Sequence, residues 1–156
     1  MRPLKILLSA VVLLSVAFLA RAEGPPTGPR TALIIGNADY SFAPLKNPIN
    51  EADPMAMALE GAGFKVIKET DADQAKMVEA VRTFSTELKQ RGGVGLFYFS
   101  GHGTQIDGEN YLLPVGAEFA SLEDVKRGSM TALAVVDAMA TGRSDLNIII
   151  LDACRN

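Results

Sequence analysis

The pattern of apolar and polar positions alternates between short apolar runs and longer segments with a helical period. Four short runs are rich in apolar residues, as in strands of a buried sheet: 31–36, 64–67, 94–99 and 146–151. Three longer segments repeat apolar residues every three or four positions, as in amphipathic helices: 52–59, 77–88 and 130–139. Strands that alternate with helices predict an α/β open sandwich, with a mostly parallel sheet flanked by helices.

Local signals add detail to these elements. Asn50 is predicted to cap the first helix, because its side chain can accept a hydrogen bond from a free backbone amide. The last helix is expected to bury Leu133, Val136 and Ala140, which share one side of it. The charged stretch 123–127 is expected to be a loop.

The first 22 residues have the pattern of a secretory signal peptide. Arg2 and Lys5 precede an apolar run that ends in Ala20-Arg21-Ala22, a small-x-small cleavage pattern. The run is shorter than the roughly 20 residues that span a bilayer. We therefore expect export to the periplasm or secretion, and an uncleaved N-terminal anchor is the alternative.

The remainder of the chain predicts a linker and one domain. Residues 23–29 contain three prolines and no apolar periodicity, as in a linker. Residues 30–156 suffice for a single domain with one hydrophobic core. The formal net charge is −3, and the expected leader holds three basic and no acidic residues, so the domain is more acidic still. Nucleic acid is therefore not expected as a partner.

The chain contains one histidine and one cysteine, and each follows a predicted strand. His102 comes after 94–99 within Ser-Gly-His-Gly, and Cys154 comes after 146–151 within Asp-Ala-Cys-Arg. Parallel strands bring their carboxyl ends to one sheet edge, so we expect the two side chains to meet there. A thiolate can attack a carbonyl carbon while an imidazole protonates the leaving amine, so the pair predicts a catalytic dyad.

The neighbourhood of the pair supports this interpretation. Gly101 and Gly103 leave room for a substrate backbone, and the Gly103 and Cys154 amides are the expected oxyanion donors. The pair is 52 residues apart, close to the caspase spacing of about 50. The alternative is a turn histidine and an inert buried cysteine. One His and one Cys are too few ligands for a zinc site, so no metal is expected, and a single cysteine excludes an intramolecular disulfide.

Four blocks of sequence carry a resemblance to a known family: residues 30–37 with Tyr40, 45–52, 97–103 and 151–156. They resemble the caspase-like clan of cysteine peptidases, and within it the bacterial metacaspase or orthocaspase type. The resemblance implies a caspase-like fold and a cysteine endopeptidase. It also implies His102 as general base and acid, Cys154 as nucleophile, and the Gly103 and Cys154 amides as the oxyanion hole.

The resemblance also implies a specificity. True caspases accept aspartate through arginines, whereas metacaspase-like relatives accept arginine or lysine through carboxylates. Asp152 matches one such carboxylate, and Glu51 stands where the relatives usually have aspartate. Cleavage after Arg or Lys is therefore expected, although the arm of Glu51 is one methylene longer. Taken alone, Asp152 also suits a turn, and Glu51 suits the first turn of a helix.

Caspase-like domains normally continue with further strands and helices beyond the nucleophile. We therefore expect 30–156 to be a C-terminally incomplete, large-subunit-like domain, with 146–151 at a sheet edge that invites pairing. A second chain or a C-terminal half is the expected partner there, beside a protein or peptide substrate. The alternative function is an inactive caspase-like fragment or a partner-binding module. No cofactor is expected, and the calcium dependence of some relatives is assigned to no residue.

Overall fold

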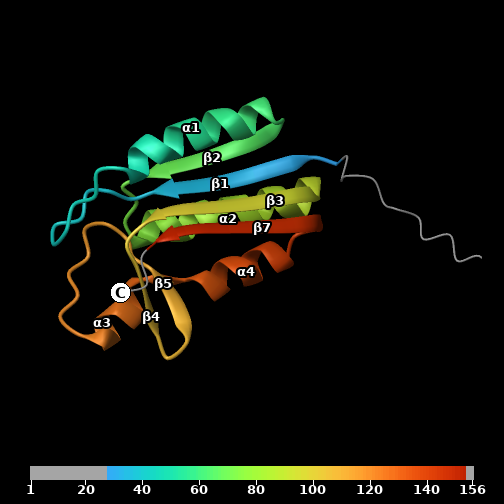
Figure 1. The fold of residues 1–156 in the computed structure, drawn as a ribbon. Helices are drawn as coiled ribbons and strands as arrows, with labels where there is room; N and C mark the ends of the chain where they lie inside the picture. The colour runs from blue at the N-terminus through green and yellow to red at the C-terminus, as the bar shows by residue number, and fades with distance from the viewer. Residues whose placement is uncertain (1–27, 154–156) are drawn as a thin grey trace, which may run out of the picture.

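The computed structural model describes residues 28–153, which form a parallel sheet covered by helices and extended by a small antiparallel sheet (Figure 1). The expected leader, most of the linker and Cys154 lie outside the described residues. The strands are β1 Arg30–Gly36, β2 Phe64–Thr70, β3 Gly93–Gly101, β4 Gly103–Ile106, β5 Glu109–Leu112, β6 Met130–Thr131 and β7 Ser144–Ala153. The helices are α1 Pro48–Gly61, α2 Gln74–Arg91, α3 Leu122–Gly128 and α4 Ala132–Ala140.

The main sheet has the order β2-β1-β3-β7, and every neighbouring pair of strands in it is parallel. Helix α1 covers one face of this sheet, and α2 and α4 cover the other (Figure 1). The predicted fold class, an α/β sandwich with a parallel sheet, is confirmed. Because parallel strands end together, the carboxyl ends of β1, β3 and β7 lie at one end of the sheet.

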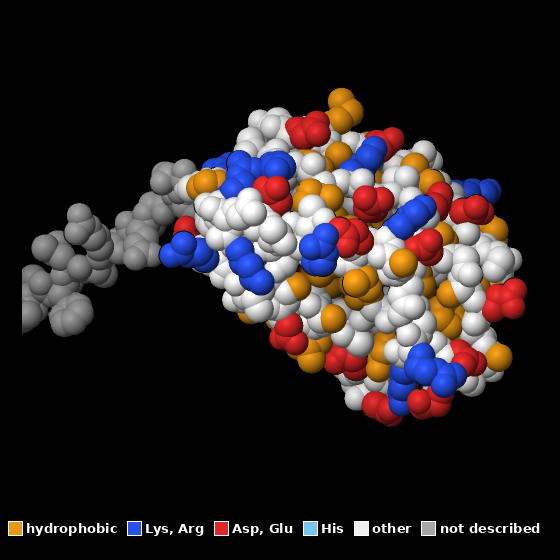
Figure 2. Space-filling view, turned by 180° about the vertical axis from the view of Figure 1, so that it is seen from behind, with side chains coloured by type: hydrophobic (Ala, Val, Ile, Leu, Met, Phe, Trp, Pro, Cys, Tyr) orange, Lys and Arg blue, Asp and Glu red, His pale blue; other side chains and the backbone are white. Residues whose placement is uncertain are grey.

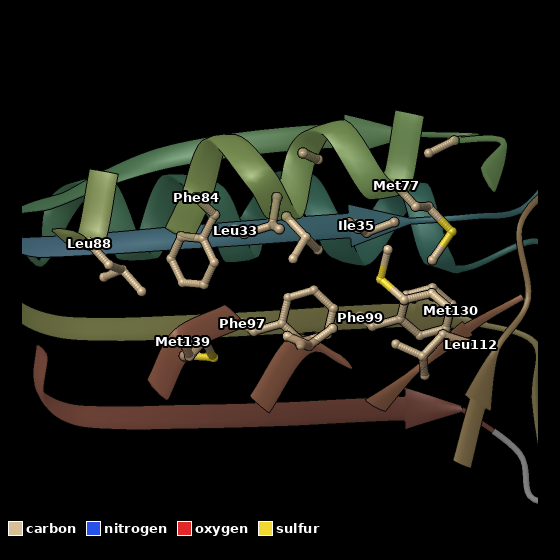
Figure 3. Packing of buried hydrophobic residues seen from close by; sticks show 14 residues of the cluster. Leu33, Ile35, Met77, Phe84, Leu88, Phe97, Phe99, Leu112, Met130 and Met139 are labelled. Carbon is tan, nitrogen blue, oxygen red and sulfur yellow. The ribbon is translucent and has the colours of Figure 1, made fainter. Parts of the chain in front are cut away.

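Alternate residues of each central strand enter two separate cores, because side chains alternate across a sheet. Ala32 and Ile34 of β1 pack with α1. Leu33 and Ile35 pack with α2 and α4, in the larger core that Figure 3 shows. Its largest side chains lie between α2 and the sheet: Met77, Phe84, Leu88, Phe97 and Phe99. With both faces covered, β3 is buried over its whole length, which explains its nearly continuous apolar sequence.

Three local expectations were wrong. Helix α1 begins at Pro48, with Asn47 rather than Asn50 at its N-cap, because proline suits the first helical turn. The charged stretch forms α3, and Ser121 caps this helix. Its acidic first turn and basic last turn interact favourably with the helix dipole. Helix α4 buries Val135 and Met139 and leaves Leu133 and Val136 exposed, so the predicted face was incorrect.

The two edges of the main sheet differ in character. At the β2 edge, Lys65 and Lys68 form ion pairs with helix carboxylates, which discourages pairing with another strand. At the other edge lies β7, as expected for 146–151, and its Leu146, Ile150 and Leu151 are exposed. On the face opposite to that of Figure 1, basic and acidic side chains are interspersed (Figure 2). Among residues 28–153, no helix is long and apolar enough to cross a membrane.

Helix α1 approaches β1 closely at Gly36. A Cβ atom at this position would lie 2.8 Å from the Pro48 carbonyl oxygen and 2.9 Å from the Ala52 Cβ. Both contacts are shorter than van der Waals separation and involve atoms that cannot rotate away. Glycine at 36 therefore fixes the position of the start of α1, which carries Glu51.

Replacing Gly36 with alanine is expected to lower the free energy of unfolding by about 1–3 kcal/mol, because α1 must shift to relieve the contact. Gly61→Ala at the end of α1 is the matched control, since a Cβ there meets nothing within 4 Å. The control is expected to be neutral or stabilising by up to about 1 kcal/mol. Urea unfolding of both variants measures this, and equal effects would contradict the packing argument.

Candidate active site

His102 lies between β3 and β4, and hydrogen bonds fix its main chain on both sides. Its backbone N–H donates to the Tyr40 hydroxyl at 3.0 Å, and its carbonyl accepts from the Leu113 N–H at 3.0 Å. A Cβ at Gly101 would lie 2.6 Å from the Tyr40 hydroxyl and 2.9 Å from the Phe99 ring. Gly101 is thus needed for the approach of Tyr40, a role different from the substrate clearance inferred from sequence.

The His102 imidazole packs against two aromatic rings and bonds a backbone carbonyl. Its ring centroid is 4.5 Å from that of Tyr40 and 5.2 Å from that of Phe42. Its Nε2 lies 2.7 Å from the Ala43 carbonyl oxygen. A carbonyl can only accept, so Nε2 carries the hydrogen in this pair. The other ring nitrogen, Nδ1, is not engaged by this hydrogen bond.

Tyr40 connects the loop after β1 to the histidine. Its side chain is 1% exposed, and its hydroxyl donates to the Leu113 carbonyl at 2.9 Å while accepting from His102. Burial raises the pKa of Tyr40 to about 12, so the hydroxyl stays protonated and can keep donating. Beneath it, the buried Asn37 amide bonds the carbonyl oxygens of Ala72 and Leu113.

The Asp71 carboxylate holds the start of the same loop. It accepts the backbone N–H groups of Ala38 and Asp39 at 2.8 and 2.9 Å. The sequence analysis assigned no role to Asp71 or Phe42, and it included Asn37 and Tyr40 only as members of a family block. The Asp71 backbone adopts a positive φ of 47°, a conformation that the sequence alone does not indicate.

The structure brings Glu51 and Asp152 to the same cleft as His102. The cleft has a volume of about 450 Å³, and its lining also includes Ser100, Lys46 and Ala153. Ser100 donates its hydroxyl hydrogen to the Glu51 carboxylate at 3.0 Å, and it lies in register with Asp152 across β3 and β7. We name this space the acidic cleft. Among its described lining residues, two carboxylates and one lysine leave a net charge of one negative unit.

The negative charge of this cleft affects the pKa of the neighbouring Tyr98. Burial raises the pKa of Tyr98, and the negative charges of Glu51 and Asp152 raise it further. Tyr98 precedes Ser100 by two residues on β3, so both side chains point to the α1 face of the sheet. The two carboxylates therefore act on a common region between α1 and the ends of β3 and β7.

The predicted nucleophile Cys154 lies outside the described residues. Ala153, which precedes it, ends β7 in register with Gly101 and lines the acidic cleft. Gly103, the expected oxyanion donor, begins β4 immediately after His102 and is half-buried. Within residues 28–153, no group of three His, Cys, Asp or Glu side chains is arranged to hold a metal ion.

Comparison with known proteins identifies the family of this chain. The family model of the caspase domain, Peptidase_C14, matches residues 29–156. The chain therefore belongs to the caspase-domain family of cysteine peptidases. It is 31% identical over 134 residues to human mucosa-associated lymphoid tissue lymphoma translocation protein 1, and 32% identical over 127 residues to the mouse homolog.

The alignments cover 85% and 81% of this chain but only 16% and 15% of those relatives. The chain thus spans a small part of the length of the curated relatives it matches. The resemblance to caspase-like peptidases is confirmed by the family model, while the residue roles and the metacaspase type stay predictions.

Replacing Tyr40 with phenylalanine is expected to lower the free energy of unfolding by about 1–3 kcal/mol, because buried polar groups of His102 and Leu113 lose their partner. The wild-type chain is also expected to lose stability as pH rises from about 10 towards 12. The unfolded Tyr40 ionises first, near its ordinary pKa of about 10, while the folded pKa is about 12. Tyr40→Phe lacks this contribution, so its alkaline loss is shallower.

Urea unfolding at pH 8 and pH 11 measures both effects. Tyr111→Phe, on the half-buried Tyr111 of β5, is the control and is expected to change stability at pH 8 less. An unchanged stability of Tyr40→Phe at pH 8 would contradict the role given to its hydroxyl.

Proposed function

We propose that this protein is a cysteine endopeptidase that cleaves peptide bonds after arginine or lysine. Its substrate is a protein or peptide, Cys154 is the nucleophile, and His102 is the general base and acid. One observation carries the proposal: His102, Glu51 and Asp152, from three separate elements, line one cleft at the ends of parallel strands. Membership of the caspase-domain family supplies the reaction class.

The hydrogen bonding of His102 suggests which nitrogen moves the proton. Because Nε2 donates to Ala43, Nδ1 accepts the proton of the Cys154 thiol. The thiolate then forms a C–S bond to the substrate carbonyl carbon, and the amides of Gly103 and Cys154 bind the oxyanion. As the C–N bond breaks, the imidazolium gives its proton to the leaving amine.

The second half of the reaction releases the acid. Water attacks the thioester carbon while His102 takes one of its protons, and the C–S bond breaks. The same proton returns to the Cys154 sulfur, which restores the starting state. The Ala43 carbonyl stabilises the imidazolium in both halves, because its oxygen faces Nε2–H.

The acidic cleft suits a basic side chain. A guanidinium or ammonium group between Glu51 and Asp152 forms charge-assisted hydrogen bonds to both carboxylates. Ser100 holds the Glu51 carboxylate in place, which reduces the entropy lost when substrate binds. Lys46 on the rim offsets part of the charge and disfavours a basic group that does not reach both acids.

We also propose that the protein is exported and that a partner strand pairs with the β7 edge of the sheet. The N-terminal signal pattern supports a periplasmic or secreted protein. The exposed apolar residues of β7 support pairing of this edge with a further strand, from a C-terminal half or a second chain. The same edge favours the second candidate function, a caspase-like module that binds a partner without catalysis.

Cys154→Ala and His102→Ala are each expected to lower turnover of Arg- and Lys-aminocoumarin peptides by about 10³-fold or more, because each removes one half of the dyad. The full chain is assayed alone and with a co-expressed C-terminal half. Thr86→Ala, on the exposed face of α2, is the control and retains activity. Absence of turnover together with slow thiol labelling of Cys154 in both preparations would leave the partner-binding function.

Glu51→Gln and Asp152→Asn are each expected to lower kcat/KM for Arg and Lys substrates by about 10- to 100-fold, because a charge-assisted hydrogen bond is lost. Asp53→Asn is the matched control, since Asp53 lies two residues beyond Glu51 and pairs with the exposed Lys68. The specificity proposal fails if Asp53→Asn has the same effect, or if peptides with aspartate at the cleaved position are preferred.

A further inference from the structure

An apolar groove lies beside His102, on the side of Phe42, and no step of the proposed reaction uses it. It has a volume of about 670 Å³, within the range typical of ligand sites. Its apolar lining comes from the loop after β1, the segment after β5, and α3: Phe42, Leu113, Ala117, Phe119, Leu122 and Val125. These loops lie at the same end of the molecule as the carboxyl ends of the sheet strands (Figure 1).

Two large side chains of this groove are unusually exposed. Phe42 is 54% exposed and Leu122 is 64% exposed. Single exposed apolar residues are ordinary on protein surfaces. Here the two residues come from opposite halves of the domain and line one concave surface, together with further apolar groups. Such a surface gains free energy when an apolar group covers it.

The groove is continuous with the catalytic histidine through Phe42. The Phe42 ring packs on the His102 ring and also lines the groove, whereas His102 itself lines the acidic cleft. The imidazole and Phe42 therefore separate the acidic cleft from the groove. A substrate with its basic side chain in the cleft places its scissile bond at the imidazole, which protonates the leaving nitrogen. The chain beyond that nitrogen then passes Phe42.

We infer that this groove binds an apolar side chain of the substrate, at the first or second residue after the scissile bond. The Phe42 ring lies 5.2 Å from the His102 ring, and an extended peptide advances about 3.3 Å per residue, so the first or second residue after the bond reaches the groove. The inference rests on the proposed function, because it takes the acidic cleft as the site of the basic residue. Glu118 is the one charged residue among the described lining residues, so an acidic side chain is disfavoured.

Hydrogen bonds hold the walls of the groove before any substrate binds. Ser121 caps α3, and the Gln74 side chain donates to the Arg127 carbonyl at 2.8 Å, which ties the end of α3 to the start of α2. The Val115 N–H donates to the Ala72 carbonyl at 3.1 Å. The opposite wall is the loop that Asp71 holds. Binding therefore needs little ordering of the protein.

Internally quenched peptides test the inference. Each has arginine before the scissile bond and Leu, Phe, Gly or Asp at one of the two following positions. We expect kcat/KM for Leu or Phe to exceed that for Gly by about tenfold or more, with Asp the poorest. Leu122→Asp is expected to reduce the ratio of Leu to Gly to about threefold or less, because it places a charge in the groove.

Leu133→Asp is the matched control. Leu133 is 53% exposed, and it lies in the first turn of α4 as Leu122 does in α3, so both helices tolerate the acidic residue. It is expected to keep the wild-type ratio. An Arg-aminocoumarin amide, which has no residue after the bond, reports the proposed function separately. Turnover of that amide with equal cleavage of Leu and Gly peptides overturns the groove inference alone, as does a preference confined to positions before the arginine.

A binding measurement tests the groove inference independently of catalytic activity. Cys154→Ala protein is titrated with the peptide Leu-Phe-Ala-amide, which represents the C-terminal product, and backbone NMR shifts are followed. The groove residues Phe119 and Val125 are expected to shift, and Leu122→Asp is expected to weaken the affinity at least about fivefold, as loss of apolar burial requires. No shift at these residues with millimolar peptide overturns the inference, even where the proposed peptidase activity is also absent.

Discussion

The hydroxyl group of Tyr40 joins the three segments on which the candidate site depends. It donates to the Leu113 carbonyl beyond β5 and accepts from the backbone of His102 between β3 and β4, while Tyr40 itself belongs to the loop after β1. Its burial makes both bonds costly to break, because no water replaces them. The bond to His102 also requires glycine at 101, since any Cβ there would clash with the hydroxyl. Among the contacts that the described residues make with His102, those to the Tyr40 hydroxyl, the Leu113 N–H and the Ala43 carbonyl fix its position.

Two spaces of opposite character meet at this fixed histidine. On one side the acidic cleft presents Glu51 and Asp152, and on the other the groove beyond Phe42 presents apolar side chains. Neither space is formed by one element, because α1, β3 and β7 contribute to the first, and two loops and α3 contribute to the second. The close packing of α1 on Gly36 and the hydrogen bonds that hold α3 therefore shape both spaces as well as stabilising the fold.

The two edges of the main sheet differ in the side chains that they expose. At the β2 edge, paired lysines keep the strand hydrated and discourage further pairing. At β7, exposed Leu146, Ile150 and Leu151 accompany an unpaired strand edge within the described part of the chain. The strand that leads to the proposed nucleophile Cys154 is thus also the edge strand with exposed apolar side chains.

The sequence by itself determined the α/β class and the main elements, because buried strands and amphipathic helices leave distinct periods. It also singled out His102, Glu51 and Asp152, since strand ends and family blocks are local features of the chain. It misjudged α3 and the buried face of α4, where capping and packing against α2 outweigh the pattern of charge and apolar spacing. Only the tertiary structure decided the rest. The Tyr40 bridge, the proton on Nε2 of His102, the Asp71 anchor and the groove beyond Phe42 all join residues distant in sequence, and no local pattern encodes such contacts.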